Sequence, residues 1–258
     1  MSRSCRCLLA ATVVLMLALA GCGGTPARGT AATSPSTATA GDAAAFARTP
    51  AAQIESDVEA ALKGATSLHM AGSIIEHGDQ VDFDVSVDTS GDCTGTMGLH
   101  GTTLHLLGVA GRYYFKASRA FWAAQDPAHA AQIWALVGGK WVAMGGGAQG
   151  GSQPGGQSAE MSSLCNLTQL TRGLFGHAGP GPTSVIGPSR FQGQPTVKLA
   201  GRSAGGAATT IQVLAAEPHY PVRVDAGSQG EMTFSRFDQP VEVAAPSPSE
   251  RVDLSRLG

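Results

Sequence analysis

The sequence has 258 residues, a formal net charge of −2 and a hydrophobic fraction of 43%. A nucleic-acid-binding chain needs a basic patch, so this charge balance argues against nucleic acid as a partner. Charged residues make up only 14% of the chain and glycine occurs 35 times, a composition that favours a strand-rich fold with many turns.

The N-terminal segment has the pattern of an export signal. Arg3 and Arg6 precede an apolar stretch of roughly 13 residues that ends at Ala20, whereas a membrane-spanning helix needs about 20. A basic start, a short apolar stretch and small residues at its end are typical of a signal peptide. We therefore predict that residues 1–21 are removed on export.

The stretch Leu19-Ala20-Gly21-Cys22 predicts a lipid attachment site. It resembles the bacterial lipobox at every position, a motif in which a small residue precedes a cysteine that becomes diacylated. Two acyl chains on Cys22 give a stable membrane anchor without a span. We expect the exported chain to be held on the outer face of the cell membrane by this diacylglyceryl group. The alternative is an ordinary secretory cleavage site beside an incidental cysteine.

The segment after Cys22 is expected to be a disordered tether over residues 22–48. It is dominated by Gly, Ala, Ser, Thr and Pro, a composition that does not bury a core. Without residues 1–21, the formal net charge falls to −4, because two of the 17 basic residues leave and all 19 acidic residues stay. This net charge argues against electrostatic docking of the chain on anionic lipid.

The cysteine count predicts one disulfide. Cys5 and Cys7 lie in the predicted signal peptide and Cys22 is expected to carry lipid, so Cys93 and Cys165 remain. Disulfides persist in an oxidising compartment, and a bridge closing a loop of this size stabilises a fold by ~4 kcal/mol on the chain-entropy model. Two buried free thiols are the alternative. Neither cysteine has a CxxC neighbour or a histidine at ligand spacing, so zinc is not indicated.

The folded domain is expected over residues 49–246, with a tail over 247–258. Thr49 suits the N-cap of a first helix, Pro50 its first position and Gly64 its end. An apolar stripe at helical spacing lies between them: Ile54, Val58, Ala61 and Leu62.

From Ser67 the apolar residues alternate with polar ones, as in strands. In residues 80–89, one face carries Val81, Phe83, Val85 and Val87, and the other carries Asp82, Asp84 and Asp88. Strands are expected as far as residue 117, and an aromatic-rich helical segment flanks Pro127. A short strand at residues 140–144, an amphipathic helix within 158–176 and further strands complete the chain.

This order of elements predicts an α+β fold. About ten antiparallel strands are too many for a flat sheet. We therefore expect a curled antiparallel sheet, an unclosed half-barrel with helices across its concave face, after the signal peptide and the tether.

With this order of elements after a lipobox and a tether, the chain resembles the LolA-like lipoproteins, including the LppX/LprG type. The resemblance rests on "SLHMAGSI" after the first helix, "GRYYFKA" followed by an aromatic helix and "GGKWVAM", and the closing "YPVRVDAG" and "MTFSRFDQPVEVAAP". It covers residues 50–246, and it implies an apolar cavity between sheet and helices that holds lipid or another hydrophobic ligand. The residues expected to line this cavity are Val81, Phe83, Val85, Leu104, Leu106, Phe121, Trp122, Trp134 and Trp141. Ordinary core packing is the alternative for each of them.

The sequence carries no recognisable catalytic, metal or cofactor motif. The seven histidines form no HExxH or comparable ligand spacing, and GxSxG is absent. The aspartates of residues 82–88 lie on a strand face and not in a calcium-binding loop. We therefore predict a lipid-binding or lipid-carrying protein rather than an enzyme, with the membrane, a lipid ligand and an envelope protein as partners. The alternative is a ligand-free interaction or sensor module of the cell envelope.

Overall fold

The computed structural model describes residues 38–76, 78–144, 163–175, 182–203 and 206–253. The chain divides into two compact units, Met1–Ser34 and Pro35–Gly258, and every described residue belongs to the second. The predicted signal peptide and Cys22 therefore lie outside the described residues. In the described part of the chain, no helix is both long enough and apolar enough to cross a membrane.

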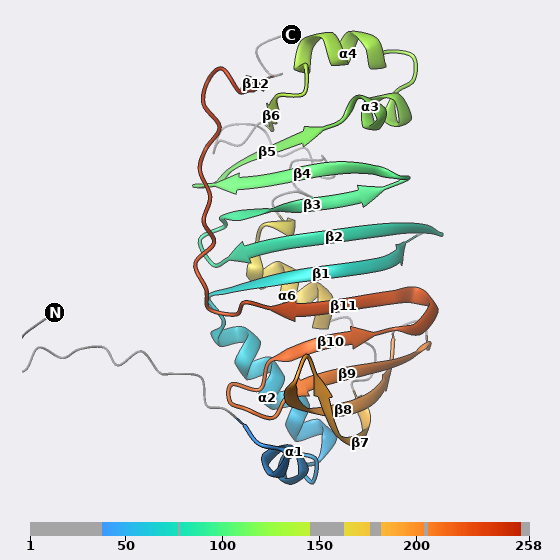
Figure 1. The fold of residues 1–258 in the computed structure, drawn as a ribbon, viewed down its shortest axis with the longest axis vertical. Helices are drawn as coiled ribbons and strands as arrows, with labels where there is room; N and C mark the ends of the chain where they lie inside the picture. The colour runs from blue at the N-terminus through green and yellow to red at the C-terminus, as the bar shows by residue number, and fades with distance from the viewer. Residues whose placement is uncertain (1–37, 77, 145–162, 176–181, 204–205, 254–258) are drawn as a thin grey trace, which may run out of the picture. The chain divides into compact units, whose positions relative to one another are not determined.

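A single curled sheet of twelve strands forms the body of the second unit (Figure 1). Its spatial order is β12-β6-β5-β4-β3-β2-β1-β11-β10-β9-β8-β7, and all neighbours are antiparallel except β12 and β6. The strands are β1 (Ser67–Glu76), β2 (Asp79–Asp88), β3 (Cys93–Leu99), β4 (Thr102–Val109), β5 (Arg112–Ala117), β6 (Trp141–Ala143), β7 (Pro182–Phe191), β8 (Gln194–Arg202), β9 (Ala208–Leu214), β10 (Pro221–Asp225), β11 (Gly230–Ser235) and β12 (Arg251–Asp253). The predicted α+β class with an unclosed curled sheet is confirmed, with twelve strands where about ten were expected.

Alternation along each strand separates a covered face from a polar face. In β2, Val85 and Val87 are buried whereas Asp82 and Asp84 are exposed, as the sequence predicts. The strand registers align the apolar positions into rows across the sheet. One such row runs through Phe234, Met70, Val85, Gly95, Leu106, Phe115 and Val142.

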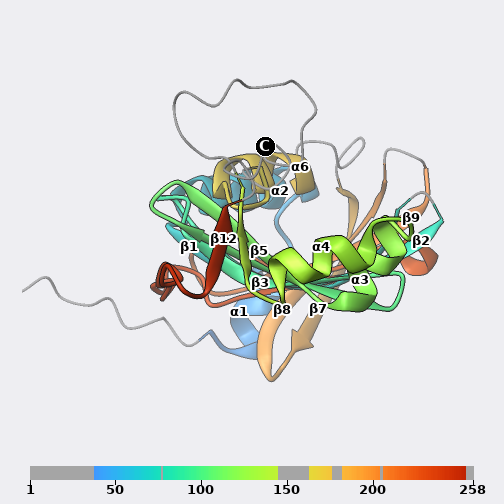
Figure 2. The same cartoon turned by 90° about the horizontal axis from the view of Figure 1, so that it is seen from above.

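Two helices, far apart in sequence, lie on the same face of the sheet (Figure 2). α2 (Ala51–Gly64) packs Ile54, Val58 and Leu62 against buried residues of β8 and β9. α6 (Leu167–Phe175) packs Leu167 against β1 and β11. The remaining helices are α1 (Ala40–Phe46), α3 (Arg119–Gln125), α4 (Ala130–Val137) and a 3-10 turn at Gly227–Gln229.

The structure differs from the predicted tether at its C-terminal end. Residues 40–46 of the expected 22–48 tether form α1, with a capping box between Thr39 and Asp42. The ring of Phe46 stacks on that of His219, with centroids 3.9 Å apart. Local capping and this long-range contact outweigh the alanine- and threonine-rich composition, so the folded unit begins earlier than predicted.

The start of α2 also differs from the prediction. Pro50 is the N-cap and Ala51 the first helical residue, while the Thr49 N–H donates to the Phe46 carbonyl at 3.0 Å. Thr49 therefore ends the preceding turn and does not cap α2.

The predicted tail over residues 247–258 contains a strand that the sequence did not indicate. Arg251–Asp253 forms β12, which pairs in parallel with β6. The Trp141 N–H donates to the Glu250 carbonyl at 2.8 Å. Three residues give too short an alternation to predict, and the pairing depends on a strand more than one hundred residues earlier.

Glycines allow strands to approach closely in the middle of the sheet. A Cβ added to Gly95 would overlap the Asp84 carbonyl of β2, and one added to Gly72 would overlap the Glu231 carbonyl of β11. These positions have no side chain because neighbouring backbone occupies the space.

Replacement of Gly95 by alanine is expected to lower the free energy of unfolding by about 2 kcal/mol or more, because backbone must move to admit the methyl group. The matched control is Gly64→Ala at the end of α2, where the added Cβ meets nothing within 4 Å. That change should leave stability unchanged or raise it by about 0.5 kcal/mol. Urea unfolding of both variants measures the difference, and equal midpoints would contradict the role given to Gly95.

Candidate functional site

The structure brings the predicted sheet residues of the cavity together on the covered face. Met97 of β3 lies between Phe83 of β2 and Leu104 of β4 in one row across the sheet. Gly95 of β3 lies between Val85 and Leu106 in the next row. Val85 and Leu106 are buried, whereas Phe83 and Leu104 are half-buried.

These residues belong to a larger cluster, which we call the apolar patch. It consists of buried Val85 and Leu106 with partly buried Phe83, Met97, Leu104, Phe115, Met144 and Leu164. The sequence analysis did not predict four of these residues, namely Met97, Phe115, Met144 and Leu164. The alternation of β3 and β5 contains the signal for Met97 and Phe115, but Leu164 reaches the patch only through the tertiary fold.

Aromatic side chains of α3 extend the patch. The ring centroids of Trp122 and Phe115 lie 5.6 Å apart, and those of Phe121 and Trp122 lie 5.5 Å apart with the two rings nearly perpendicular. The indole Nε1 of Trp122 is buried and has no acceptor among the described residues. A buried donor without a partner costs about 1–3 kcal/mol, so a carbonyl oxygen placed there would bind favourably.

Two predicted lining residues lie elsewhere. Val142, not Trp141, pairs with Phe115, so Trp141 projects from the opposite face of β6. Trp134 belongs to α4, which packs against α3 and β12. The prediction was wrong for Trp141 because a three-residue strand does not reveal its inward face. Val81 remains on the covered face of β2, in the next row beyond Phe83.

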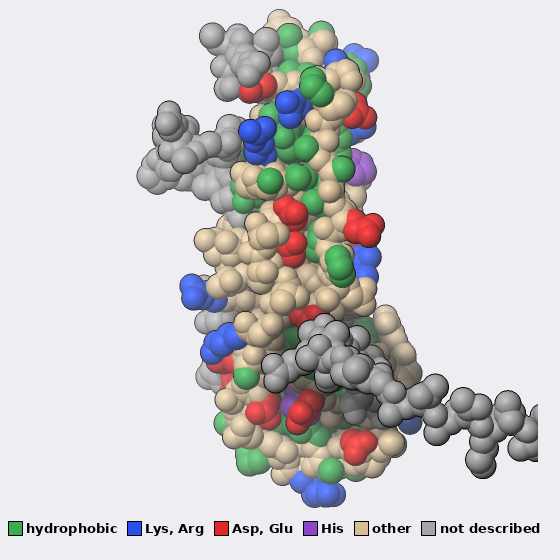
Figure 3. Space-filling view, turned by 90° about the vertical axis from the view of Figure 1, so that its left-hand side faces the viewer, with side chains coloured by type: hydrophobic (Ala, Val, Ile, Leu, Met, Phe, Trp, Pro, Cys, Tyr) green, Lys and Arg blue, Asp and Glu red, His purple; other side chains and the backbone are tan. Residues whose placement is uncertain are grey.

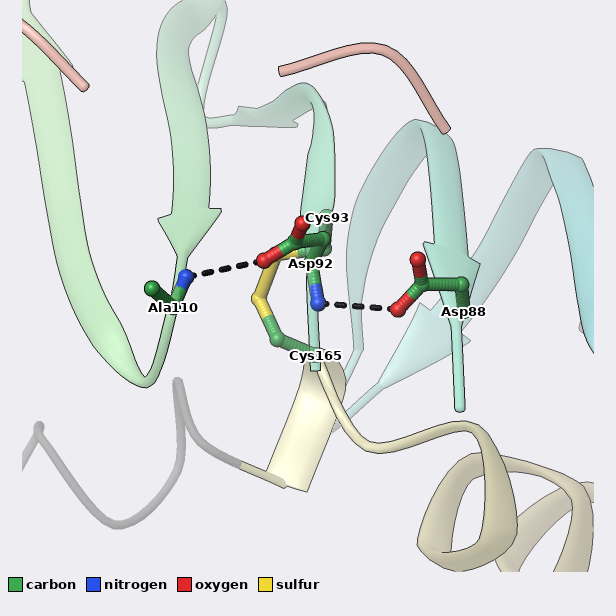
Figure 4. Close-up of a disulfide and its surroundings, with 5 residues drawn as sticks. All are labelled: Asp88, Asp92, Cys93, Ala110 and Cys165. Atoms are coloured by element: carbon green, nitrogen blue, oxygen red, sulfur yellow. Dashed lines mark hydrogen bonds between the residues drawn. A yellow bond between two sulfur atoms is a disulfide. The ribbon is translucent and has the colours of Figure 1, made fainter. Parts of the chain in front are cut away.

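The predicted disulfide is present and fixes α6 over the sheet. Cys93 is the first residue of β3, Cys165 precedes α6, and their Cα atoms are 5.3 Å apart. Beside it, the Ala110 N–H donates to Asp92 at 2.8 Å and the Asp92 N–H donates to Asp88 at 3.0 Å (Figure 4). The bridge is fully buried with Leu68, Met70, Val87, Leu167 and Phe234.

A hydrogen-bonded node centred on Asp238 fixes the end of α2. Its Oδ1 accepts from the N–H and hydroxyl of Thr66, at 2.8 and 3.1 Å, directly before β1. Its Oδ2 accepts from the hydroxyl of Tyr220 at 2.6 Å. The ring of Tyr220 stacks on Phe237 at 3.9 Å. The "RFDQP" segment, which the sequence analysis used only for the family resemblance, follows β11 and therefore links the start of β1 to the start of β10.

The polar face carries acidic residues, an ion pair between Arg223 and Glu231 at 2.7 Å, and a row of hydrogen bonds centred on His69. His69 Nε2 lies 3.0 Å from Asp84 Oδ1, and His69 Nδ1 lies 3.1 Å from Ser235 Oγ. These groups come from three adjacent strands, so we interpret the row as cross-strand stabilisation. Among the described residues, no three His, Cys, Asp or Glu side chains are grouped to hold a metal ion.

Charge is distributed unevenly along the sheet. Residues 67–99 contain six acidic residues and no lysine or arginine. Figure 3 shows acidic side chains at mid-height on the face that it views, and basic, acidic and hydrophobic side chains together toward the upper end.

No family model and no curated protein matches the chain. The chain has weak likenesses to solved structures, among them the following three. An uncharacterized conserved protein from Thermus thermophilus has 13% identity and a TM-score of 0.35, with 79% of this chain and 98% of that chain covered. MucB, in complex with MucA(peri), has 12% identity and a TM-score of 0.29, covering 77% and 58%. A DUF1329 family protein from Desulfovibrio piger has 8% identity and a TM-score of 0.26, covering 76% and 95%. Scores below 0.5 carry no argument about fold or function.

The Asp238 node predicts a stability change at alkaline pH. Burial, and then the hydrogen bond to Asp238, raise the pKa of the Tyr220 hydroxyl well above its ordinary value of about 10. Above about pH 10 the unfolded chain loses this proton while the folded chain keeps it. The stabilisation is therefore complete below about pH 10 and falls as the pH rises further.

The variant Tyr220→Phe keeps the stacked ring but loses the hydroxyl, and it should be about 1.5 kcal/mol less stable than the parent at neutral pH. The gap should shrink as the pH rises above about 10, because only the parent carries this proton. Urea unfolding of both proteins across this range measures the gap. Parallel stability curves would show that the hydrogen bond does not act as described.

Proposed function

We propose that this chain is a membrane-anchored extracytoplasmic lipoprotein that binds lipid or another hydrophobic ligand at the apolar patch. The observation that carries the proposal is the incomplete burial of that patch. Two buried residues, Val85 and Leu106, are surrounded by six large side chains that remain partly exposed on the face that the helices cover. Under α2, in contrast, six residues are buried and five partly buried hydrophobic residues pack around them.

Partly exposed apolar surface on a covered face is suited to an acyl chain. Burial of such surface contributes about 25 cal/mol per Å², and ligand sites combine an apolar lining with a few polar groups. The unpartnered Nε1 of Trp122 is a polar group of this kind, because it can donate to the ester or carboxyl oxygen of a lipid. Binding of this type needs no catalytic residue.

Ligand binding is tested with residues 35–258, which form one compact unit. Native mass spectrometry of this unit, incubated with phospholipid and fatty acid, should show bound acyl chains. Leu104→Glu should weaken binding by about tenfold or more, because it places a charge in the patch. Thr103→Glu is the matched control, since this neighbouring residue is exposed on the other face of β4.

Absence of acyl-chain uptake by the parent unit would exclude ligand binding and favour the envelope interaction module. Equal binding by both glutamate variants would move the ligand site away from the patch. Circular dichroism of Leu104→Glu establishes that any loss of binding is not a loss of fold.

Anchoring is tested separately in cells that export the full chain. Cys22→Ala should move the protein from the membrane fraction to the soluble exported fraction, because the acyl chains are then missing. Cys5→Ala, within the predicted signal peptide, should leave fractionation unchanged. Retention of the Cys22→Ala protein on membranes would refute the lipid anchor without affecting the ligand proposal.

A further inference from the structure

The α3–α4 hairpin is apolar in sequence but buries little in the structure. Its helices read RAFWAAQ and AAQIWALV. α3 has no buried residue and α4 has only Val137, whereas α2 buries four. Leu136 is 56% exposed. Phe121, Ile133 and Trp134 are half-buried.

The hairpin is nevertheless held in a defined conformation. The Ser118 hydroxyl accepts from the Phe121 N–H at 3.2 Å and caps α3. The Asp126 carboxylate accepts from the His129 N–H at 3.2 Å in the turn. Gly138, in the left-handed conformation, donates its N–H to the Trp134 carbonyl at 2.8 Å and ends α4. The exposed apolar surface is therefore a built feature of the fold and not a frayed end.

Basic side chains flank this surface. Lys116, Arg119 and Lys140 are exposed, and Asp126, the acidic residue within the hairpin, is paired with His129 at 2.9 Å. In the adjoining segment, Arg251 is offset by Asp253 and Glu250 is offset by nearby Lys116, so the excess positive charge at this end comes from Arg119 and Lys140. The middle of the sheet, over residues 67–99, carries six acidic residues and no lysine or arginine.

We infer that the α3–α4 hairpin is a membrane-contact surface that binds a bilayer with anionic head groups. Its apolar side chains lie at the boundary between head groups and acyl chains, where tryptophan is favoured, and the flanking Lys and Arg side chains contact lipid phosphates. The acidic middle of the sheet is repelled by the same bilayer, so the charge separation also orients the molecule. The net negative charge of the chain argues against attraction of the whole surface to anionic lipid, but it does not argue against docking by this one basic and apolar end.

The contact lies beside the apolar patch, because Trp122 of α3 also touches Phe115. It depends neither on a ligand in the patch nor on the anchor at Cys22. It is tested with residues 35–258, which lack both the apolar N-terminal stretch and Cys22, on vesicles of phosphatidylcholine with or without phosphatidylglycerol.

Cosedimentation should show binding to vesicles that contain phosphatidylglycerol and weak binding to phosphatidylcholine alone. All three tryptophans of the chain lie within residues 122–141, so a blue shift of intrinsic fluorescence on binding reports on this end. Leu136→Glu should reduce binding by about tenfold or more. Ile186→Glu is the matched control, because this side chain on β7 is equally exposed, at 57%.

Three outcomes would overturn the inference. The first is that residues 35–258 bind neither kind of vesicle. The second is that Leu136→Glu and Ile186→Glu reduce binding equally. The third is that light scattering reveals a dimer that Leu136→Glu dissociates. The last result would assign the surface to a second copy of the chain. If vesicle binding is absent but acyl chains are still taken up, the ligand proposal stands and the membrane-contact inference fails. If vesicles are bound but no acyl chain is taken up, the membrane-contact inference stands and the ligand proposal fails.

Discussion

The structure depends on how one apolar face of a twelve-stranded sheet is covered. Burial of that face supplies the main stabilisation of the fold, but a sheet of this width needs more than one helix to cover it. α2 covers β8 and β9 through Ile54, Val58 and Leu62, and the Asp238 node fixes its end. α6 covers β1 and β11, and the Cys93–Cys165 disulfide fixes its start.

Between these helices and α3, coverage is partial, and this is where the apolar patch lies. The strand row that α6 covers at Phe234 and Met70 continues through Val85 and Leu106 to Phe115, which is only half-buried. Incomplete burial is costly in an ordinary core, because voids forfeit packing contacts. A ligand that covers these side chains would offset this cost, which links the stability of the fold to the function that we propose.

Charge and apolarity together give the molecule a direction. An acidic middle and a basic, apolar hairpin would interact with an anionic bilayer with opposite signs, the first by repulsion and the second by attraction. In this proposal the lipid attachment at Cys22 limits only how far the molecule lies from the membrane, whereas the hairpin would determine which end faces it. Trp122 connects that end to the patch through Phe115. An acyl chain entering from the bilayer would therefore meet the hairpin first.

The sequence by itself determined the elements with strong local periodicity and the cysteine pair. The alternation of β1 and β2, the stripe from Ile54 to Leu62 and the two cysteines outside the predicted signal peptide and lipid site were sufficient, because period and counting need no tertiary information. Half of the patch was likewise predictable from alternation. Only the tertiary structure decided the position of Leu164, the outward face of Trp141, α1 and β12. Each depends on contacts between residues distant in sequence, and short segments take their conformation from such contacts because their local preferences are too weak to fix it.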